Sequence, residues 1–142
     1  MMRLAVIVVA AFLGACGSPK PPLVVSELEV TRPLPGRDMS AAFFVVTNNA
    51  DESIRITGVT SPQFASVEIH ETTVTDGVAR MRELDVLDIP AQGRVVLERG
   101  GKHLMLLQAQ DLGDSATLQF LSNGTPLLSV NYVFPTDKPE DN

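Results

Sequence analysis

The chain has 142 residues, 44% of them hydrophobic, and a formal net charge of −6. This length is enough for one domain with a hydrophobic core of its own. The acidic balance argues against nucleic acid as a partner, because nucleic acids bind basic surfaces. A single cysteine excludes an internal disulfide, a thiol redox pair and a zinc site built from several cysteines.

The first residues differ from the rest of the chain and are typical of an export signal. Arg3 precedes an apolar run of ten residues, LAVIVVAAFL (4–13), which is too short to span a bilayer as a helix. A positive start, a short apolar core and small residues after it indicate a secretory signal peptide. We therefore expect residues 1–15 to be a signal peptide and the protein to act outside the cytoplasm, in the periplasm of a cell with two membranes.

The small residues before the only cysteine resemble the lipobox of bacterial lipoproteins, here LGAC (13–16). The resemblance implies cleavage before Cys16 and lipidation of Cys16, which would be the membrane attachment. Residues 16–22 would then be the lipidated cysteine and a flexible, proline-rich tether. The alternative is a plain signal peptide that is cut near Ala15, and export is expected in both cases.

From Leu23 onward, nearly every segment alternates polar and apolar residues or carries a β-branched run, which is typical of strands. The predicted strands are 23–31, 39–48, 53–59, 66–74, 78–84, 94–100, 102–108, 116–122 and 127–134.

Turn signals separate these strands. Thr75-Asp76-Gly77 predicts a tight turn, and residues 85–90 are also expected to be a turn. Many short strands without a long helical period predict an all-β sandwich or barrel. We expect a single domain over residues 23–134, followed by an acidic tail at 135–142.

The stretch GGKHLMLL (100–107) places a histidine and a methionine two positions apart in a predicted strand. Because side chains alternate along a strand, His103 and Met105 should share one face, with Leu104 and Leu106 on the other. Met39 is expected to be an ordinary packing residue at the start of a buried strand.

Both histidines of the chain and two of its methionines form one set: His70, Met81, His103 and Met105. Ten residues lie between His70 and Met81, 21 between Met81 and His103, and one between His103 and Met105. Thioethers are soft, neutral ligands that suit Cu(I), and imidazole also binds copper. Zinc prefers cysteine, histidine or carboxylate, and calcium and magnesium prefer oxygen. The set therefore favours Cu(I).

The spacing H-x10-M-x21-H-x-M, with the flanking EIHETTVTDGVARMREL and DIPAQGRVVLERGGKHLMLL, resembles the periplasmic copper A chaperone (PCuAC) family. The resemblance covers residues 25–134 and implies a cupredoxin-like, Greek-key β-sandwich. It implies that His70, Met81, His103 and Met105 bind Cu(I). It further implies delivery to the copper A subunit of cytochrome c oxidase, often alongside a Sco-type protein. Many members carry methionine directly after the first histidine, where this chain has Glu71.

Other interpretations stay open. The same site could serve copper sequestration or tolerance, or the chain could be a metal-free scaffold lipoprotein. An enzyme is not expected, since a type-1 copper centre needs a cysteine thiolate. We expect a monomer.

Several charged residues near the set have two interpretations each. Glu68 and Glu71 could orient His70, or could be surface charges. The basic residues could be a solvated rim or a docking patch for an acidic partner; they are Arg80, Arg82, Arg99 and Lys102.

Overall fold

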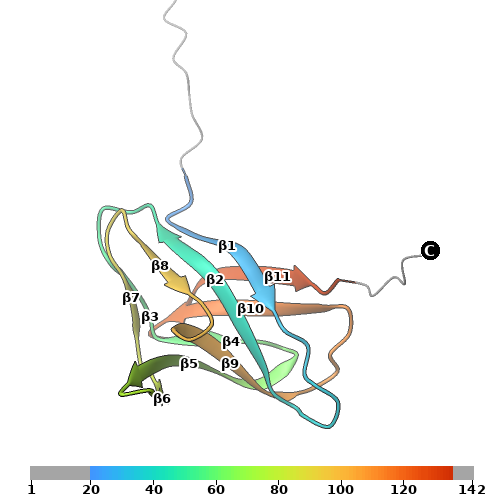
Figure 1. Cartoon of the computed structure of the whole chain (residues 1–142). Helices are drawn as coiled ribbons and strands as arrows, with labels where there is room; N and C mark the ends of the chain where they lie inside the picture. The colour runs from blue at the N-terminus through green and yellow to red at the C-terminus, as the bar shows by residue number, and fades with distance from the viewer. Residues whose placement is uncertain (1–19, 136–142) are drawn as a thin grey trace, which may run out of the picture.

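The computed structural model describes residues 20–135, and over this range the chain forms strands and turns but no helix (Figure 1). No helix in the described part is therefore long and apolar enough to cross a membrane. The prediction of an all-β fold is confirmed. The strands are β1 (Leu23–Val30), β2 (Ser40–Asn48), β3 (Ile54–Ile56), β4 (Gly58–Thr60), β5 (Phe64–Thr75), β6 (Val78–Glu83), β7 (Leu87–Ile89), β8 (Arg94–Leu97), β9 (Lys102–Ala109), β10 (Ser115–Ser122) and β11 (Thr125–Val133).

Nine of these strands form one continuous antiparallel sheet in the order β1-β2-β9-β5-β4-β10-β11, with β6 paired to β5 and β8 paired to β2. The two ends of this order, β1 and β11, contact each other, so the sheet curls into a nearly closed sandwich. β3 and β7 form a separate two-stranded sheet.

The core lies between the two layers and consists of aromatic and branched aliphatic side chains. Phe44 of β2 and Phe120 of β10 meet edge to face, with ring centroids 5.5 Å apart. β2 alternates between buried and half-buried positions along its whole length, as a strand with one face on the core should. Leu104 and Leu106 are fully buried in this core, so His103 and Met105 of β9 face the other way.

The segment 53–59 is two strands, where one was predicted. β3 pairs with β7 and β4 pairs with β10, so the chain crosses from one sheet to the other at Thr57. Thr57 marks the crossing: its backbone N–H donates to the Leu121 carbonyl, and its Oγ1 accepts from the Asn123 N–H. Because polar and apolar residues alternate regularly through this segment, the change of partner strand could not be predicted from the sequence.

The prediction of a turn over residues 85–90 was wrong for Leu87–Ile89, which form β7. Leu87 and Ile89 are buried and Asp88 is exposed, which is strand alternation over only three residues. The buried side chain of Asn48 supports β7 by donating to the Ile89 carbonyl at 3.2 Å.

Two further expectations concern the ends of strands. Met39 is 42% exposed and precedes β2, so the interpretation as a packing residue of a buried strand was wrong. β1 begins at Leu23 as predicted. Ahead of it, the carbonyls of Pro21 and Pro22 accept hydrogen bonds from Asn49, so this end of the predicted tether is fixed to the domain.

The predicted signal peptide (1–15) and the lipidated Cys16 lie outside the described residues, as does the acidic tail beyond Pro135.

Candidate metal centre

The β5–β6 hairpin places the first two residues of the candidate set. Its two-residue turn is Asp76-Gly77, and both residues have positive φ, 52° and 76°. This is the geometry that a type I′ turn requires, and it follows the predicted tight turn. The resulting register puts Met81 opposite Thr72. Thr72 and His70 share one face of β5, so Met81 lies diagonally beside His70 on that face.

Pairing between β5 and β9 brings in the other two residues. His70 lies directly opposite His103, and Glu68 lies opposite Met105. Opposed residues in an antiparallel pair share a face, so both histidines and Met105 project from the same side of the sheet. All four residues of the predicted set therefore occupy one face, over three adjacent strands.

This face is partly open to solvent. His103 is only 7% exposed and the His70 side chain 14%, whereas Met81 is 52% exposed. The Phe43 ring covers His103 from the β2 side, with ring centroids 6.3 Å apart. The imidazoles are thus sheltered, while one thioether can be reached from outside.

The two nitrogens of His70 have different surroundings. Nε2 lies 2.8 Å from the Glu68 carboxylate, which as an anion only accepts hydrogen bonds, so Nε2 carries the proton in this contact. Nδ1 is fully buried and has no hydrogen-bond partner among the described residues. In a neutral ring, Nδ1 then holds a free lone pair, and a buried nitrogen without a partner is costly unless a ligand binds it.

The second ring is oriented by the backbone. His103 Nδ1 lies 3.0 Å from the Gly101 carbonyl oxygen, which can only accept, so Nδ1 is the donor and Nε2 of the neutral ring is left free. The two rings have centroids 6.0 Å apart. Each imidazole therefore offers one unprotonated nitrogen, fixed by a hydrogen bond from the other nitrogen, as is usual for metal-binding histidines.

Glu71, next to His70, ties the strands of the site together. Its carboxylate accepts from Lys102 Nζ of β9 at 2.8 Å and from Arg82 of β6 at 2.6 Å. These two cations, Lys102 first, lower the pKa of Glu71 below its usual value. Of the two interpretations of Glu71, the structure favours neither, because this carboxylate holds the strands and does not contact His70.

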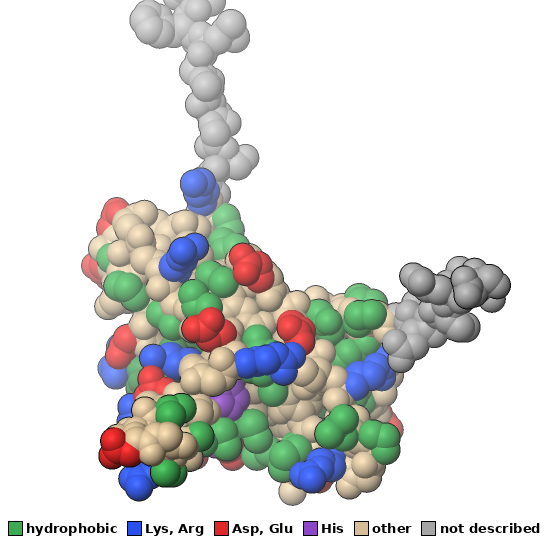
Figure 2. All heavy atoms as spheres, in the orientation of Figure 1, with side chains coloured by type: hydrophobic (Ala, Val, Ile, Leu, Met, Phe, Trp, Pro, Cys, Tyr) green, Lys and Arg blue, Asp and Glu red, His purple; other side chains and the backbone are tan. Residues whose placement is uncertain are grey.

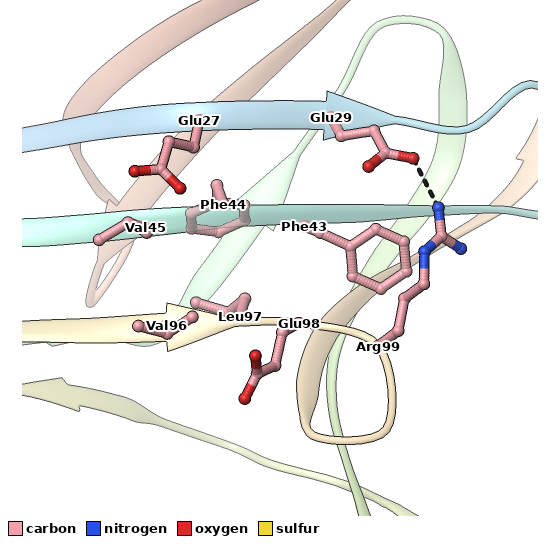
Figure 3. Close-up of a pocket in the computed structure, with 9 residues that line it drawn as sticks. All are labelled: Glu27, Glu29, Phe43, Phe44, Val45, Val96, Leu97, Glu98 and Arg99. Atoms are coloured by element: carbon pink, nitrogen blue, oxygen red, sulfur yellow. Dashed lines mark hydrogen bonds and ion pairs between the residues drawn. The ribbon is translucent and has the colours of Figure 1, made fainter.

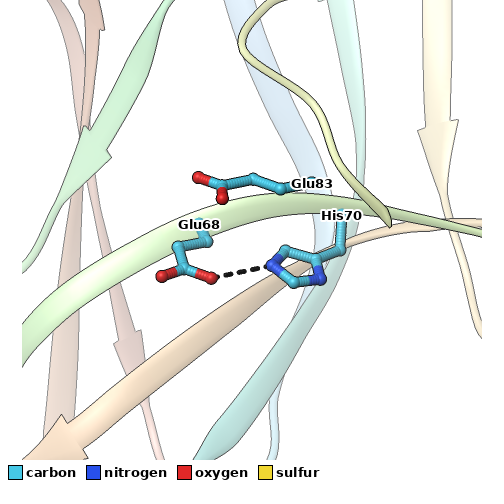
Figure 4. A group of neighbouring side chains, drawn as sticks. All are labelled: Glu68, His70 and Glu83. Carbon is cyan, nitrogen blue, oxygen red and sulfur yellow. Dashed lines mark hydrogen bonds and ion pairs between the residues drawn. The ribbon is translucent and has the colours of Figure 1, made fainter. Parts of the chain in front are cut away.

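The structure adds one residue that the sequence interpretation missed. Glu83 lies opposite His70 on β6, and ligand atoms of Glu68, His70 and Glu83 all lie within 4.8 Å of one another (Figure 4). Counting outward from the Asp76-Gly77 turn would have paired Glu83 with His70. An oxygen-rich group of this kind suits a harder cation than Cu(I), but one of its histidine nitrogens, Nε2, is already engaged by Glu68.

Comparison with known proteins places the chain in a family. The profile of the family described as "Putative lipoprotein LpqE-like" matches residues 23–126. The chain belongs to the LpqE-like family. The chain is 33% identical over 101 residues to the protein named "Putative lipoprotein Lxx21020" of Leifsonia xyli subsp. xyli. The match covers 67% of this chain and 61% of that protein.

A second relative is the uncharacterized protein RP573 of Rickettsia prowazekii, 26% identical over 104 residues, which are 70% of this chain and 58% of that protein. The chain therefore matches about three-fifths of the length of each of these relatives.

Solved structures with the same fold are PCuAC domains. The copper-bound PCuAC domain from PmoF2 has a TM-score of 0.64 and 22% identity, covering 80% of this chain and 92% of that domain. The Cu(I) form of DR1885 from Deinococcus radiodurans has a TM-score of 0.58 and 27% identity, covering 80% and 79%. These likenesses confirm the predicted cupredoxin-like β-sandwich and the resemblance to PCuAC proteins.

Proposed function

We propose that this LpqE-like protein is an exported copper chaperone that carries Cu(I) between His70, Met81, His103 and Met105. The observation that carries the proposal is the strand register, which sets these four side chains on one face of β9, β5 and β6. Copper is the cargo here. Transfer is an exchange of ligands between two proteins, and no bond of an organic substrate is made or broken.

The ligand atoms follow from the hydrogen bonds of the two rings. His70 binds through Nδ1 and His103 through Nε2, because their other nitrogens donate to Glu68 and to the Gly101 carbonyl. Two neutral imidazoles and two thioethers leave the bound ion with its single charge. Cu(I) tolerates such soft, low-charge surroundings better than zinc, calcium or magnesium do.

The solved relatives support copper as the ion. The structures of similar fold include a copper-bound PCuAC domain and the Cu(I) form of DR1885. We propose the copper A centre of cytochrome c oxidase as the recipient, with a Sco-type protein as a further partner. The 52% exposure of Met81 fits this role, since it leaves part of the proposed ligand set open to a partner protein.

The proposal is tested by an anaerobic Cu(I) titration of the purified protein against a competing chelator. One tightly bound Cu(I) per chain is expected. The His103→Ala/Met105→Ala variant should lose that binding, and Met39→Leu, which removes a methionine outside the set, should keep it. Equal affinity in the double variant and the wild type would overturn the ligand assignment.

Delivery and sequestration are separated by deleting the gene. Delivery predicts poor loading of copper A and low oxidase activity when copper is scarce, with unchanged survival when copper is abundant. Sequestration predicts the reverse pattern.

We also propose export with a lipid anchor on Cys16, which the family description and the Leifsonia relative's name support. Metabolic labelling with a fatty acid is the measurement. Label should appear on the wild type and disappear in Cys16→Ser; label on neither would leave a plain signal peptide as the explanation.

A further inference from the structure

A pocket of about 470 Å³ lies on the β2 side of the candidate metal centre. We call it the arginine pocket; it is lined by Thr31, Arg32, Leu34, Arg37, Met39, Ser40, Ala41, Arg99 and Met105. Met105 belongs to the proposed copper-binding set, so an occupant of this pocket can reach a proposed ligand. The register explains the contact, because Ala41 of β2 lies opposite Met105 of β9.

The charge of the arginine pocket is opposite to that of the whole chain. Three arginines and no acidic residue line it, whereas the chain carries a net charge of −6. Arg37 forms no ion pair with any described residue. Arg32 lies over the Phe134 ring at 4.3 Å, donates to the Gly113 carbonyl at 3.4 Å and approaches Asp114 at 3.9 Å. Arg99 is paired with Glu29. The pocket therefore keeps positive charge that the protein itself does not neutralise.

The mouth of the arginine pocket is also apolar. Leu34 is 67% exposed and Met39 is 42% exposed, and both lie in the loop between β1 and β2. In Figure 2, a histidine is visible on this face beside hydrophobic side chains, with basic and acidic side chains near it. Exposed apolar side chains bordered by arginines are typical of protein interfaces, in which methionine and arginine are enriched.

A second hollow continues this surface across β2. It has a volume of about 390 Å³ and contains three carboxylates, from Glu27, Glu29 and Glu98 (Figure 3). Arg99 lines both hollows and lies over the Phe43 ring at 4.5 Å. The charge of the surface thus changes from positive to negative at Arg99. A partner whose charges are arranged in the opposite order would be held in one orientation.

We propose that the arginine pocket is the docking site for an acidic, copper-accepting protein. This inference rests on the proposed function and extends it to the surface through which copper leaves. Acidic residues of the recipient would bind Arg32 and Arg37, an apolar side chain would pack on Leu34 and Met39, and the recipient's own ligand would thereby be brought to Met105.

The position of the pocket favours a protein over an anionic membrane. The loop between β1 and β2 lies at the opposite end of β1 from Leu23, where the chain enters the domain (Figure 1). The length of β1 separates the two by roughly 23 Å. An anchor ahead of Leu23 would therefore be joined to the end of the domain that lies away from the arginine pocket.

The test uses the metal-free protein, labelled with carbon-13 at its methionine methyl groups. The probe is the metal-free soluble copper A domain of the same organism's oxidase, at low salt. Binding should shift the methyl signals of Met39 and Met105. Arg37→Glu should weaken binding about three- to tenfold, and the matched exposed variant Arg94→Glu on β8 should leave it unchanged.

Three outcomes would overturn the inference: no shift of Met39 and Met105, equal binding by Arg37→Glu and Arg94→Glu, or the same Arg37-dependent shifts with phosphatidylglycerol vesicles and none with the copper A domain. Because the readout needs no metal, it remains decisive even if the protein fails to bind Cu(I). A failed Cu(I) titration would refute the proposed function, and a failed methyl titration with intact Cu(I) binding would refute only the docking site.

Discussion

The hydrogen bond between Glu68 and His70 decides which nitrogen of the ring is free. A histidine without such a partner populates both tautomers, and only one of them leaves the Nδ1 lone pair free to bind a metal. The 2.8 Å contact holds the ring in that form before any metal arrives. Glu68 is therefore a positioning residue in our account.

Removing this contact should change the tautomer of His70 and weaken copper binding. In Glu68→Ala, we expect nitrogen-15 spectra of the metal-free protein to show a mixture of tautomers at His70, where the wild type shows a proton on Nε2. Loss of such a partner typically costs about 10- to 100-fold in metal affinity. Glu68→Gln should retain most of the affinity, since its amide oxygen still accepts.

The neighbouring Glu71→Gln is the control for this experiment, since Glu71 contacts Lys102 and Arg82 and not the imidazole. An unchanged His70 spectrum in Glu68→Ala would show that the carboxylate does not select the tautomer.

The thioethers can be separated from packing residues by a swap that conserves shape. Met105→Leu and Met81→Leu should weaken Cu(I) binding strongly, because leucine has no donor atom, while each costs less than about 1.5 kcal/mol of stability. Competition titration and urea unfolding of the same samples make the comparison. Full Cu(I) affinity in both variants would mean that these methionines only fill space.

At the scale of elements, β5, β6 and β9 form the platform of the site, and Glu71 joins them by accepting from Arg82 and Lys102. The lowered pKa of Glu71 means that its ionised form is favoured in the folded state. The unfolded chain therefore takes up a proton first as the pH falls. The stabilisation is present above about pH 4.5 and is lost as the pH drops through the lower folded-state pKa.

Glu71→Gln should accordingly lower the stability of the metal-free protein at pH 7, with a smaller difference from wild type at pH 3.5. Urea unfolding at the two pH values is the measurement. A difference that stays constant or grows at the acidic pH would contradict the role of the ionised carboxylate.

Most of the strands and turns of the fold could be predicted from local sequence patterns. The Asp76-Gly77 turn and the alternation along β5 determine the hairpin, and counting from the turn gives its register. β7 escaped prediction because three residues of alternation carry too little signal, and its existence depends on pairing with β3 and on the Asn48 side chain. The pairing of strands that lie far apart in the sequence cannot be predicted from the pattern of any one segment.

The candidate site, too, could be predicted only in part from the sequence. The four proposed ligands stood out by residue type and spacing. The free nitrogen of each histidine did not, because it depends on where Glu68 and the Gly101 carbonyl lie once the strands pair. The exposure of Met39 was also hidden, since an apolar residue before a strand has the same sequence pattern whether it is covered or not.

At the scale of the whole molecule, the candidate site and the hydrophobic core lie on opposite faces of β9. Leu104 and Leu106 of β9 are buried between the layers, and His103 and Met105 project from the opposite face of the same strand. Core packing therefore holds the metal-binding face in place.

This coupling predicts that copper rescues a weakened core. Leu104→Ala should lower the free energy of unfolding by about 2–5 kcal/mol. Free Cu(I) at a hundred times its dissociation constant should return about 2.7 kcal/mol, because it binds only the folded state. Thermal unfolding of the variant with and without Cu(I) tests this, and a melting temperature that Cu(I) does not raise would contradict the coupling.

The most direct test of the central claim is X-ray absorption at the copper edge of the Cu(I)-loaded protein. Our account predicts a mixed shell of nitrogen and sulfur ligands, with the sulfur contribution falling in Met105→Leu and falling further when Met81→Leu is added. A shell of nitrogen and oxygen alone, unchanged in these variants, would place the ion on His70, Glu68 and Glu83 and contradict the proposed set.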